Sequence, residues 1–195
     1  GTPYASFPLE NRRKSGLLAP SLAQSTQRGT EIAVPFYWNI APERDLTVTP
    51  VYMSERGEQV KGDYRYLGAR HSGQLRGEYL PNDAVLGTAR SGVSWQHEQR
   101  FSPQLLGRLD LNQVSDDTYF VDLYSQVRQV STGNLPRDAY LQYQSKLGAT
   151  SYFLQGRVQR FQTLQDPLNP IVSPYHRVPQ LNFNVTRNEI ADHLY

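Results

Sequence analysis

Charged residues that recur at every second position are the main candidates for ligand chemistry in this chain. They alternate with apolar residues in VKGDYRYL, and the same spacing returns in LGRLDLNQV and SYFLQGRVQRF. Alternate side chains of a strand share one face, so this set would line a polar surface able to make charge-assisted hydrogen bonds to a polar or charged ligand. A polar lining is also what any barrel lumen requires, and for each residue alone that interpretation is favoured. The set comprises six charged residues, Lys61, Asp63, Arg65, Arg108, Asp110 and Arg157, together with the polar Gln159.

Residues suited to catalysis or metal binding are sparse. The four histidines fall in no zinc-ligand spacing, there is no cysteine, and no nucleophile-elbow motif occurs. Asp116, Asp117 and Asp122 in the expected 115–136 loop offer carboxylates of the kind that calcium binds, but their spacing matches no known calcium loop. The sequence therefore predicts a protein that is not an enzyme and holds no metal or cofactor.

Two prolines interrupt the first two strand-like runs of the chain. Pro20 lies in LLAPSLAQST (17–26) and Pro35 in TEIAVPFYWNI (30–40). Proline has no N–H to donate to a ladder, so we expect the pair to weaken one seam of a sheet, which could then open there. The alternative is a local bulge or edge-strand proline without a mechanical role. Pro50 also lies within a strand, and the sequence assigns it no role.

The strands that carry these residues are long and one-sided. Helical periodicity is almost absent, and no run approaches the ~20 apolar residues of a membrane-spanning helix. Alternation instead predicts ten strands with one apolar face each. Their expected ranges are 16–26, 30–41, 45–54, 58–68, 72–80, 89–100, 104–114, 137–147, 150–163 and 177–187.

Strand length and connections distinguish a membrane barrel from a soluble β-sandwich. Sandwich strands average ~5–6 residues, whereas tilted membrane strands need ~9–11, and most of the segments here are of the longer kind. Tight turns are expected on one side of the sheet and longer connections, at 81–88, 115–136 and 164–176, on the other. Tyr and Trp near strand ends fit interfacial girdles, although Tyr also simply favours strands. The aromatic set is Tyr37, Trp38, Tyr52, Tyr64, Tyr66, Tyr79, Trp95, Tyr119 and Tyr152.

Composition excludes some other classes. The net charge of +2 and the scattered basic residues give no sign of nucleic-acid binding. The chain starts with GTPYASFP and ends with ADHLY, without an initiator methionine or a signal peptide, and we interpret it as a fragment. The fold class expected is thus all-β, an antiparallel transmembrane β-barrel segment of about ten meander strands, with a passive outer-membrane porin and a soluble β-sandwich binding module as alternatives.

Several phrases resemble a known family. PYASFPLENRRKSGLLAPS (3–21), PFYWNIAPERDLTVTPVYMSERGEQVKGDYRYL (35–67), YLPND (79–83) and VSDDTYFVDL (114–123) are similar to the start of the barrel domain of LptD proteins, which assemble lipopolysaccharide (LPS) at the Gram-negative outer membrane. The resemblance is dense through residue 67 and looser to about residue 125. It implies a barrel of about 26 strands, with residues 1–15 linking it to a preceding periplasmic jelly-roll and residues 16–195 forming its first strands.

The resemblance also implies function and partners. LPS would reach the barrel from a periplasmic transport bridge through the jelly-roll and leave through a lateral gate between the first and last strands. An LptE-like lipoprotein would plug the lumen, and BAM-type machinery would insert the barrel. Pro20 and Pro35 match the two gate prolines of the family, while the disulfide cysteines of the family are absent. The six charged residues named above would line the LPS path.

Overall fold

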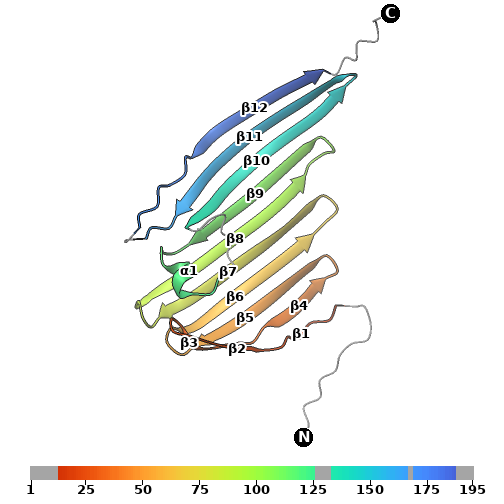
Figure 1. Ribbon diagram of the computed structural model, residues 1–195. Helices are drawn as coiled ribbons and strands as arrows, with labels where there is room; N and C mark the ends of the chain where they lie inside the picture. Colours follow the sequence, from red (N-terminus) through yellow and green to blue (C-terminus); the bar gives the residue numbers. More distant parts are fainter. Residues whose placement is uncertain (1–12, 126–132, 167–168, 188–195) are drawn as a thin grey trace, which may run out of the picture.

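The computed structural model describes residues 13–125, 133–166 and 169–187, and these form one antiparallel sheet of twelve strands. Figure 1 shows the strands running side by side from one edge of a curved sheet to the other. The elements are β1 Gly16–Leu17, β2 Ser21–Ser25, β3 Gly29–Ala33, β4 Phe36–Ala41, β5 Arg44–Met53, β6 Gly57–Leu67, β7 His71–Asp83, β8 Thr88–Arg100, β9 Leu105–Val114, α1 Tyr119–Asp122, β10 Asn134–Leu147, β11 Thr150–Thr163 and β12 Arg177–Arg187.

The expected all-β antiparallel meander is confirmed. From β5 to β12 each strand pairs with the next one in the chain, and the first two expected strands are each divided into two, β1 with β2 and β3 with β4. All described strands belong to a single open sheet, so the two-sheet sandwich alternative is wrong. No helix in the described part of the chain is long and apolar enough to cross a membrane.

The two faces of the sheet differ in chemistry along every strand. We call the face that carries Lys61, Asp63 and Arg65 the inner face and the opposite one the outer face. The outer face exposes large apolar side chains on strands from both halves of the sheet, because alternation persists through each strand. A contiguous apolar surface of this extent is unusual for a soluble monomer. Its members include Leu22, Ile32, Phe36, Trp38, Tyr52, Val60, Tyr79, Val93, Trp95, Leu141, Leu154, Val158 and Phe183.

Connections differ between the two ends of the strands. Tight turns at 42–43, 68–70, 101–104 and 148–149 lie at one end, as expected. At the other end the expected 81–88 connection is shorter, because β7 continues to Asp83 through a bulge after Leu80. The Asp83 carboxylate then accepts a hydrogen bond from the Val85 N–H at 2.9 Å, which closes the turn. We call this end, where residues 115–125 also lie, the loop end.

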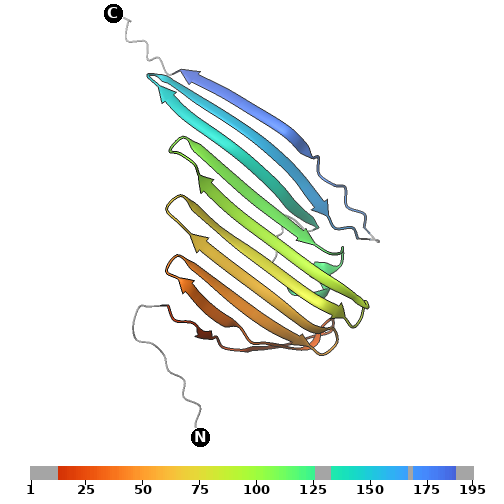
Figure 2. The ribbon, with the colours of Figure 1, turned by 180° about the vertical axis from the view of Figure 1, so that it is seen from behind.

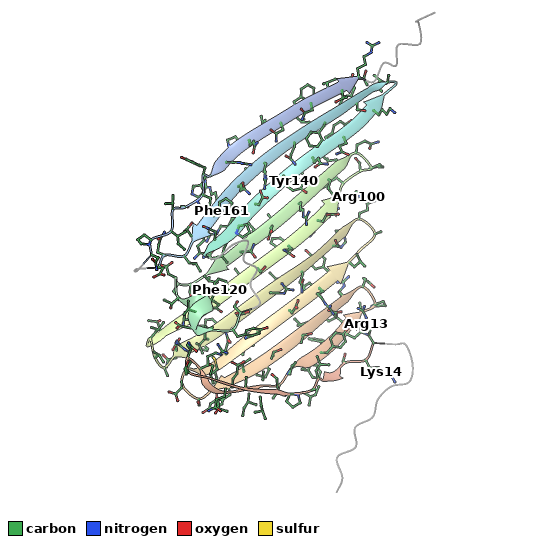
Figure 3. All side chains as sticks on the ribbon, in the orientation of Figure 1. Arg13, Lys14, Arg100, Phe120, Tyr140 and Phe161 are labelled. Carbon is green, nitrogen blue, oxygen red and sulfur yellow. The ribbon has the colours of Figure 1, made fainter. Side chains whose placement is uncertain are left out.

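A small core covers the inner face at the loop end. Residues 115–125, including α1, pack against one face of the sheet only, as Figures 1 and 2 show from opposite sides. Tyr119 and Leu123 from this segment are buried against Leu80 and Val114 of the strands. Figure 3 shows Phe120 on α1, in front of the sheet. Among the described residues, the inner wall is therefore covered at one end and open along the rest of its length.

Two aromatic residues that the sequence analysis assigned to the interfacial girdles do not lie on the outer face. Tyr119, which belongs to the 115–125 segment, is fully buried against the inner face of the sheet. The Tyr37 hydroxyl lies 3.2 Å from the Asp45 carboxylate on the inner face. Alternation explains Tyr37, since it falls between the outward Phe36 and Trp38. Proximity to a strand end does not by itself indicate which face a side chain occupies.

Candidate functional site

The first strand is broken at Pro20. β1 pairs with β4 at Leu17 and Phe36, whereas β2 resumes against β3 at Ser21 and Ala33. The register changes by one residue across the break, so the first strand has one extra residue between Leu17 and Ser21. Two residues opposite one define a β-bulge, which bends and twists the strand that contains it.

The second strand is broken at Pro35, one step further along. The Leu18 N–H donates to the Pro35 carbonyl oxygen at 2.8 Å. In an antiparallel pair of this kind the two residues normally exchange both bonds, but Pro35 has no N–H to return. The seam between the first and second strands is therefore short of one bond at this position.

The two prolines lie differently in this seam. Pro20 lies in the stretch of the first strand that holds the extra residue, between Leu17 and Ser21, whereas Pro35 accepts a bond from Leu18 and cannot return one. Val34, the residue before Pro35, directs its N–H to the Pro50 carbonyl oxygen of β5 at 3.1 Å. Alternation along the sequence could not reveal the bulge, because a register shift is a relation between two strands. That both prolines weaken the seam remains a prediction.

Beside β1, side-chain bonds hold the chain that precedes it. Residues 1–12 lie outside the described part of the chain, so the expected linker is described only from Arg13 onward. Arg13 Nη1 lies 3.2 Å from Asp45 Oδ2, and the Asn39 side chain donates to the Arg13 carbonyl at 2.8 Å. The Asn39 N–H also donates to Ser15 Oγ at 2.8 Å. Figure 3 shows Arg13 at this edge of the sheet.

The three charged residues of β6 lie on the inner face as predicted, and each has a close partner. Arg65 binds the buried Asp45 through two hydrogen bonds of 2.8 and 2.9 Å. Asp63 accepts from the Gln74 side chain at 2.7 Å. Lys61 Nζ donates to the Tyr124 carbonyl at 2.5 Å beneath the 115–125 segment. Lys61 is thus covered, whereas Arg65 remains about half exposed.

The remaining predicted residues lie on the same face, farther across the sheet. Arg157 of β11 forms two hydrogen bonds of 2.8 and 2.7 Å to Asp138. Arg108 of β9 lies opposite Tyr140 of β10, and Asp110 accepts from the Asn112 side chain at 2.7 Å. The registers separate this group from the β6 residues by β7 and β8. The six residues therefore share a wall and do not converge on a single site.

The most buried charge network was not predicted from the sequence. Arg90 of β8 is 1% exposed and contacts three carboxylates, Asp83 at 3.0 Å, Asp116 at 2.6 Å and Asp122 at 2.9 Å. Arg56 contacts Asp83 at 2.7 Å and Asp122 at 3.0 Å. We call these five residues the arginine cluster. It holds the 115–125 segment against the inner face.

The arginine cluster also explains the carboxylates that suggested calcium. Burial alone would raise the pKa of Asp116, but hydrogen bonds from Arg90, Ser115 and Thr118 lower that pKa below its ordinary value. Asp116 and Asp122 are thus neutralised by guanidinium groups. Among the described residues, no group of three or more His, Asp or Glu side chains could hold a metal ion.

Tyr119 is the second anchor of the 115–125 segment. Its hydroxyl donates to Glu78 at 3.0 Å in a buried position. Burial and the neighbouring Glu78 carboxylate raise the Tyr119 pKa far above its ordinary value, so the hydroxyl keeps its proton as a donor. The Arg90 guanidinium also lies 5.4 Å from the centre of the Tyr119 ring.

Comparison with known proteins identifies the family. The family model "LptD: LPS transport system D" matches residues 88–195. The LPS-assembly protein LptD of Azoarcus sp. strain BH72 is 44% identical over 96% of this chain, and that of Aromatoleum aromaticum is 43% identical over 97%. The chain belongs to the LptD family. It spans 23% of the length of each of these two relatives, so it corresponds to about a quarter of an LptD protein.

The matches extend the likeness to the second half of this LptD segment. Sequence phrases carried the resemblance most strongly up to residue 67, whereas the family model covers the part from residue 88 onward. One feature of the sequence could have predicted the arginine cluster of this LptD segment. Arg90 is in phase with Ser94 and Gln96 on the polar side of its strand, and Asp116 and Asp122, if buried, would require a positively charged partner. Only the fold shows that Arg56 is the second arginine that contacts these aspartates.

Proposed function

We propose that this segment forms the first strands of an outer-membrane LptD barrel that releases LPS into the outer leaflet through a lateral gate beside its first strand. The observation that carries the proposal is the division of both first strands at Pro20 and Pro35. The long strands β5 to β12 pair continuously apart from local bulges. A bulge and a missing donor lower the cost of separating backbone that must move.

The two faces support the membrane setting of the proposal. The outer face exposes apolar side chains along strands of up to 14 residues, which is enough to cross a bilayer core when tilted. Acyl chains of LPS would leave along this face. Ile32 and Phe36, which flank the break at Pro35, are both exposed there.

The inner face would carry the hydrophilic part of the ligand. We propose that Arg65, Arg108 and Arg157, with Lys61, Asp63 and Asp110, line the path of the phosphates and sugars. Guanidinium groups bind phosphate oxygens through paired N–H donors. Arg65 is more accessible than Arg157, with side-chain exposures of 54% and 27%. We assign the segment a transport role and no catalytic one.

The proposal includes the partners that the family resemblance implies. Residues 1–15 would connect to the periplasmic jelly-roll that receives LPS from the transport bridge, and residues 16–195 would form barrel wall. An LptE-like lipoprotein would occupy the lumen against the open part of the inner face, and BAM-type machinery would insert the barrel. The contacts of Arg13 with Asp45 and Asn39 support a connecting segment that reaches the barrel beside the first strand.

Photocrosslinking in the full-length protein tests the gate. A photoreactive residue at Ile32 or Phe36 should form LPS adducts during active transport. The matched control is Val158, which is exposed to a similar degree on the outer face of β11. Adducts at Ile32 and Phe36 but not at Val158 support the gate. Equal labelling at all three positions, or none at Ile32 and Phe36, refutes it, and a stable ion-conducting channel without labelling would favour a passive porin.

A further inference from the structure

A third proline lies beside the break at Pro35, in the next strand. Both segments of the second strand pair with β5 in one register, Ala33 opposite Val51 and Phe36 opposite Val48. That register places Val34 opposite Pro50. Pro50 therefore lies next to the break at Pro35 although it belongs to an otherwise continuous strand.

The hydrogen bond at this pair shows which seam Pro50 weakens. The Val34 N–H donates to the Pro50 carbonyl oxygen at 3.1 Å. The reciprocal bond would need an N–H on Pro50, which proline lacks. On its other side β5 pairs with β6 without interruption from Arg44 to Met53. The missing donor of Pro50 thus lies between β5 and the second strand.

The second strand is consequently weakened on both sides at adjacent residues. Pro35 removes a donor toward the first strand, and Pro50 removes one toward β5. Beyond this level, the hairpin of β2 and β3 is joined to β5 by a ladder that covers only residues 31–33 and 51–53. Turn contacts follow, from the Ser54 N–H to the Thr30 carbonyl, from the Glu55 N–H to the Arg28 carbonyl and from the Arg56 side chain to the Gln27 carbonyl. A short ladder next to two missing bonds should open more easily than the continuous ladders from β5 to β12.

We propose that Pro50 makes the seam between β5 and the second strand a hinge, on which the hairpin of β2 and β3 moves as one unit when the gate opens. This inference rests on the proposed function and deepens it. The covalent turn at 26–28 keeps β2 and β3 together. Opening then requires the hairpin to bend away from β5, and Pro35 with Pro50 places the bending point at residues 34–35.

The other prolines within strands lack this arrangement. Pro81, Pro136 and Pro179 each lie two residues from an end of their strand, where a ladder finishes in any case. Pro136 also accepts a hydrogen bond from the Asn112 side chain at 3.0 Å. Pro136→Ala is therefore a suitable control for Pro50→Ala, because it restores an N–H in a strand far from the first hairpin.

The first test restores the missing donor in the full-length protein. Pro50→Ala supplies an N–H that can bond to the Val34 carbonyl. One net backbone bond corresponds to an approximately 2- to 10-fold change in an opening equilibrium. The Val34 amide should exchange with deuterium more slowly by that factor, and LPS export should slow. Pro136→Ala should change neither. An unchanged Val34 exchange rate, or slower exchange with normal export, overturns the hinge.

A disulfide across the hinge provides a second test that does not depend on proline. The paired residues Ala33 and Val51 are a non-hydrogen-bonded pair, because Val34 makes the neighbouring bond. Such pairs have Cα atoms about 4.5 Å apart, within the range for a disulfide. Oxidised Ala33→Cys/Val51→Cys should block export. Each single-cysteine variant, and the equivalent pair Gln142→Cys/Gln155→Cys between β10 and β11, should not.

The outcomes separate the hinge from the gate itself. If Ile32 is labelled by LPS and Pro35→Ala slows export, but Pro50→Ala and the Ala33–Val51 disulfide have no effect, the hinge is wrong and the gate stands. If Ile32 is not labelled, the gate is wrong and the hinge falls with it. Slower export in Pro50→Ala together with a block by the disulfide supports the hinge.

Discussion

Replacing Arg90 with Met should release the 115–125 segment from the inner face. Arg90 is 1% exposed and neutralises Asp83, Asp116 and Asp122. Removing one partner of a buried ion pair costs about 3–5 kcal/mol, because the remaining charges stay buried. Arg56 still contacts Asp83 and Asp122, and Asp116 is partly exposed to water. We therefore expect the lower end, about 3 kcal/mol, or a more than hundredfold rise in local opening.

Hydrogen exchange of α1 in the full-length protein measures this release. The amides of Val121 and Asp122 bond to the Thr118 carbonyl at 3.0 Å, and that of Leu123 bonds to the Tyr119 carbonyl at 2.9 Å. Their exchange should accelerate about a hundredfold in Arg90→Met, in line with the cost of a broken buried pair. Arg44→Met is the matched control, since Arg44 and Glu43 are half exposed and 3.8 Å apart, a pair worth ~0–1 kcal/mol. Less than about tenfold acceleration in Arg90→Met would show that the segment is held mainly by its apolar contacts.

Three further perturbations address the neighbouring contacts. Because the pKa of Asp116 is lowered in the folded state, its contribution to stability is present above the ordinary carboxyl pKa of about 3.9 and is lost as the pH falls through the lower folded value. A spin label at the exposed Val121 should therefore stay immobile from about pH 7 to 5. Mobilisation of the label near pH 6 would contradict this. Tyr119→Phe removes the donor to Glu78 and should cost about 1–3 kcal/mol, seen as faster exchange of the same α1 amides, while unchanged exchange would exclude the hydroxyl as an anchor. Asp45→Asn weakens the contacts of Arg65 and Arg13, so a spin label at position 14 should become more mobile, which the control Asp63→Asn should not reproduce.

The regular part of the fold could be predicted from sequence, because apolar–polar alternation within a single strand is enough to define it. Alternation sets both the faces and the approximate ends of β5 to β12, and the six predicted inner-face charges share one wall. The division of the first two strands was not predicted, because alternation continues through Ile32, Val34 and Phe36 across the break. The effect of each proline depended on register, which is a relation between strands and not a property of one strand.

The 115–125 segment could not be predicted for a related reason. Its position depends on pairs that are distant in sequence, such as Arg90 with Asp122 and Arg56 with Asp83. Charges in a loop are usually solvated, so a loop with three aspartates gives no indication that it folds inward. The buried Tyr119 resembled an interfacial aromatic for the same reason: short-range patterns do not distinguish a side chain directed to lipid from one covered by its own loop.

The first hairpin is loosened near its base and held near its tip by separate groups. Pro35 and Pro50 omit donors where the hairpin leaves the sheet, whereas Arg56 of the arginine cluster donates from Nε to the Gln27 carbonyl in the turn of the hairpin at 2.7 Å. The same guanidinium contacts Asp122 of the 115–125 segment at 3.0 Å. Movement of the hairpin must therefore break the contact of Arg56 with that segment or move the segment as well.

Arg56→Met should raise the hydrogen-exchange rates of the hairpin amides, and Pro50→Ala should lower them. In the double variant the two changes in opening free energy should add, because the two sites lie at different levels of the hairpin and share no partner. If Arg56→Met raised exchange only at the turn, and Pro50→Ala lowered it only near Val34, then the tip and the base of the hairpin would open separately and the hairpin would not move as one unit.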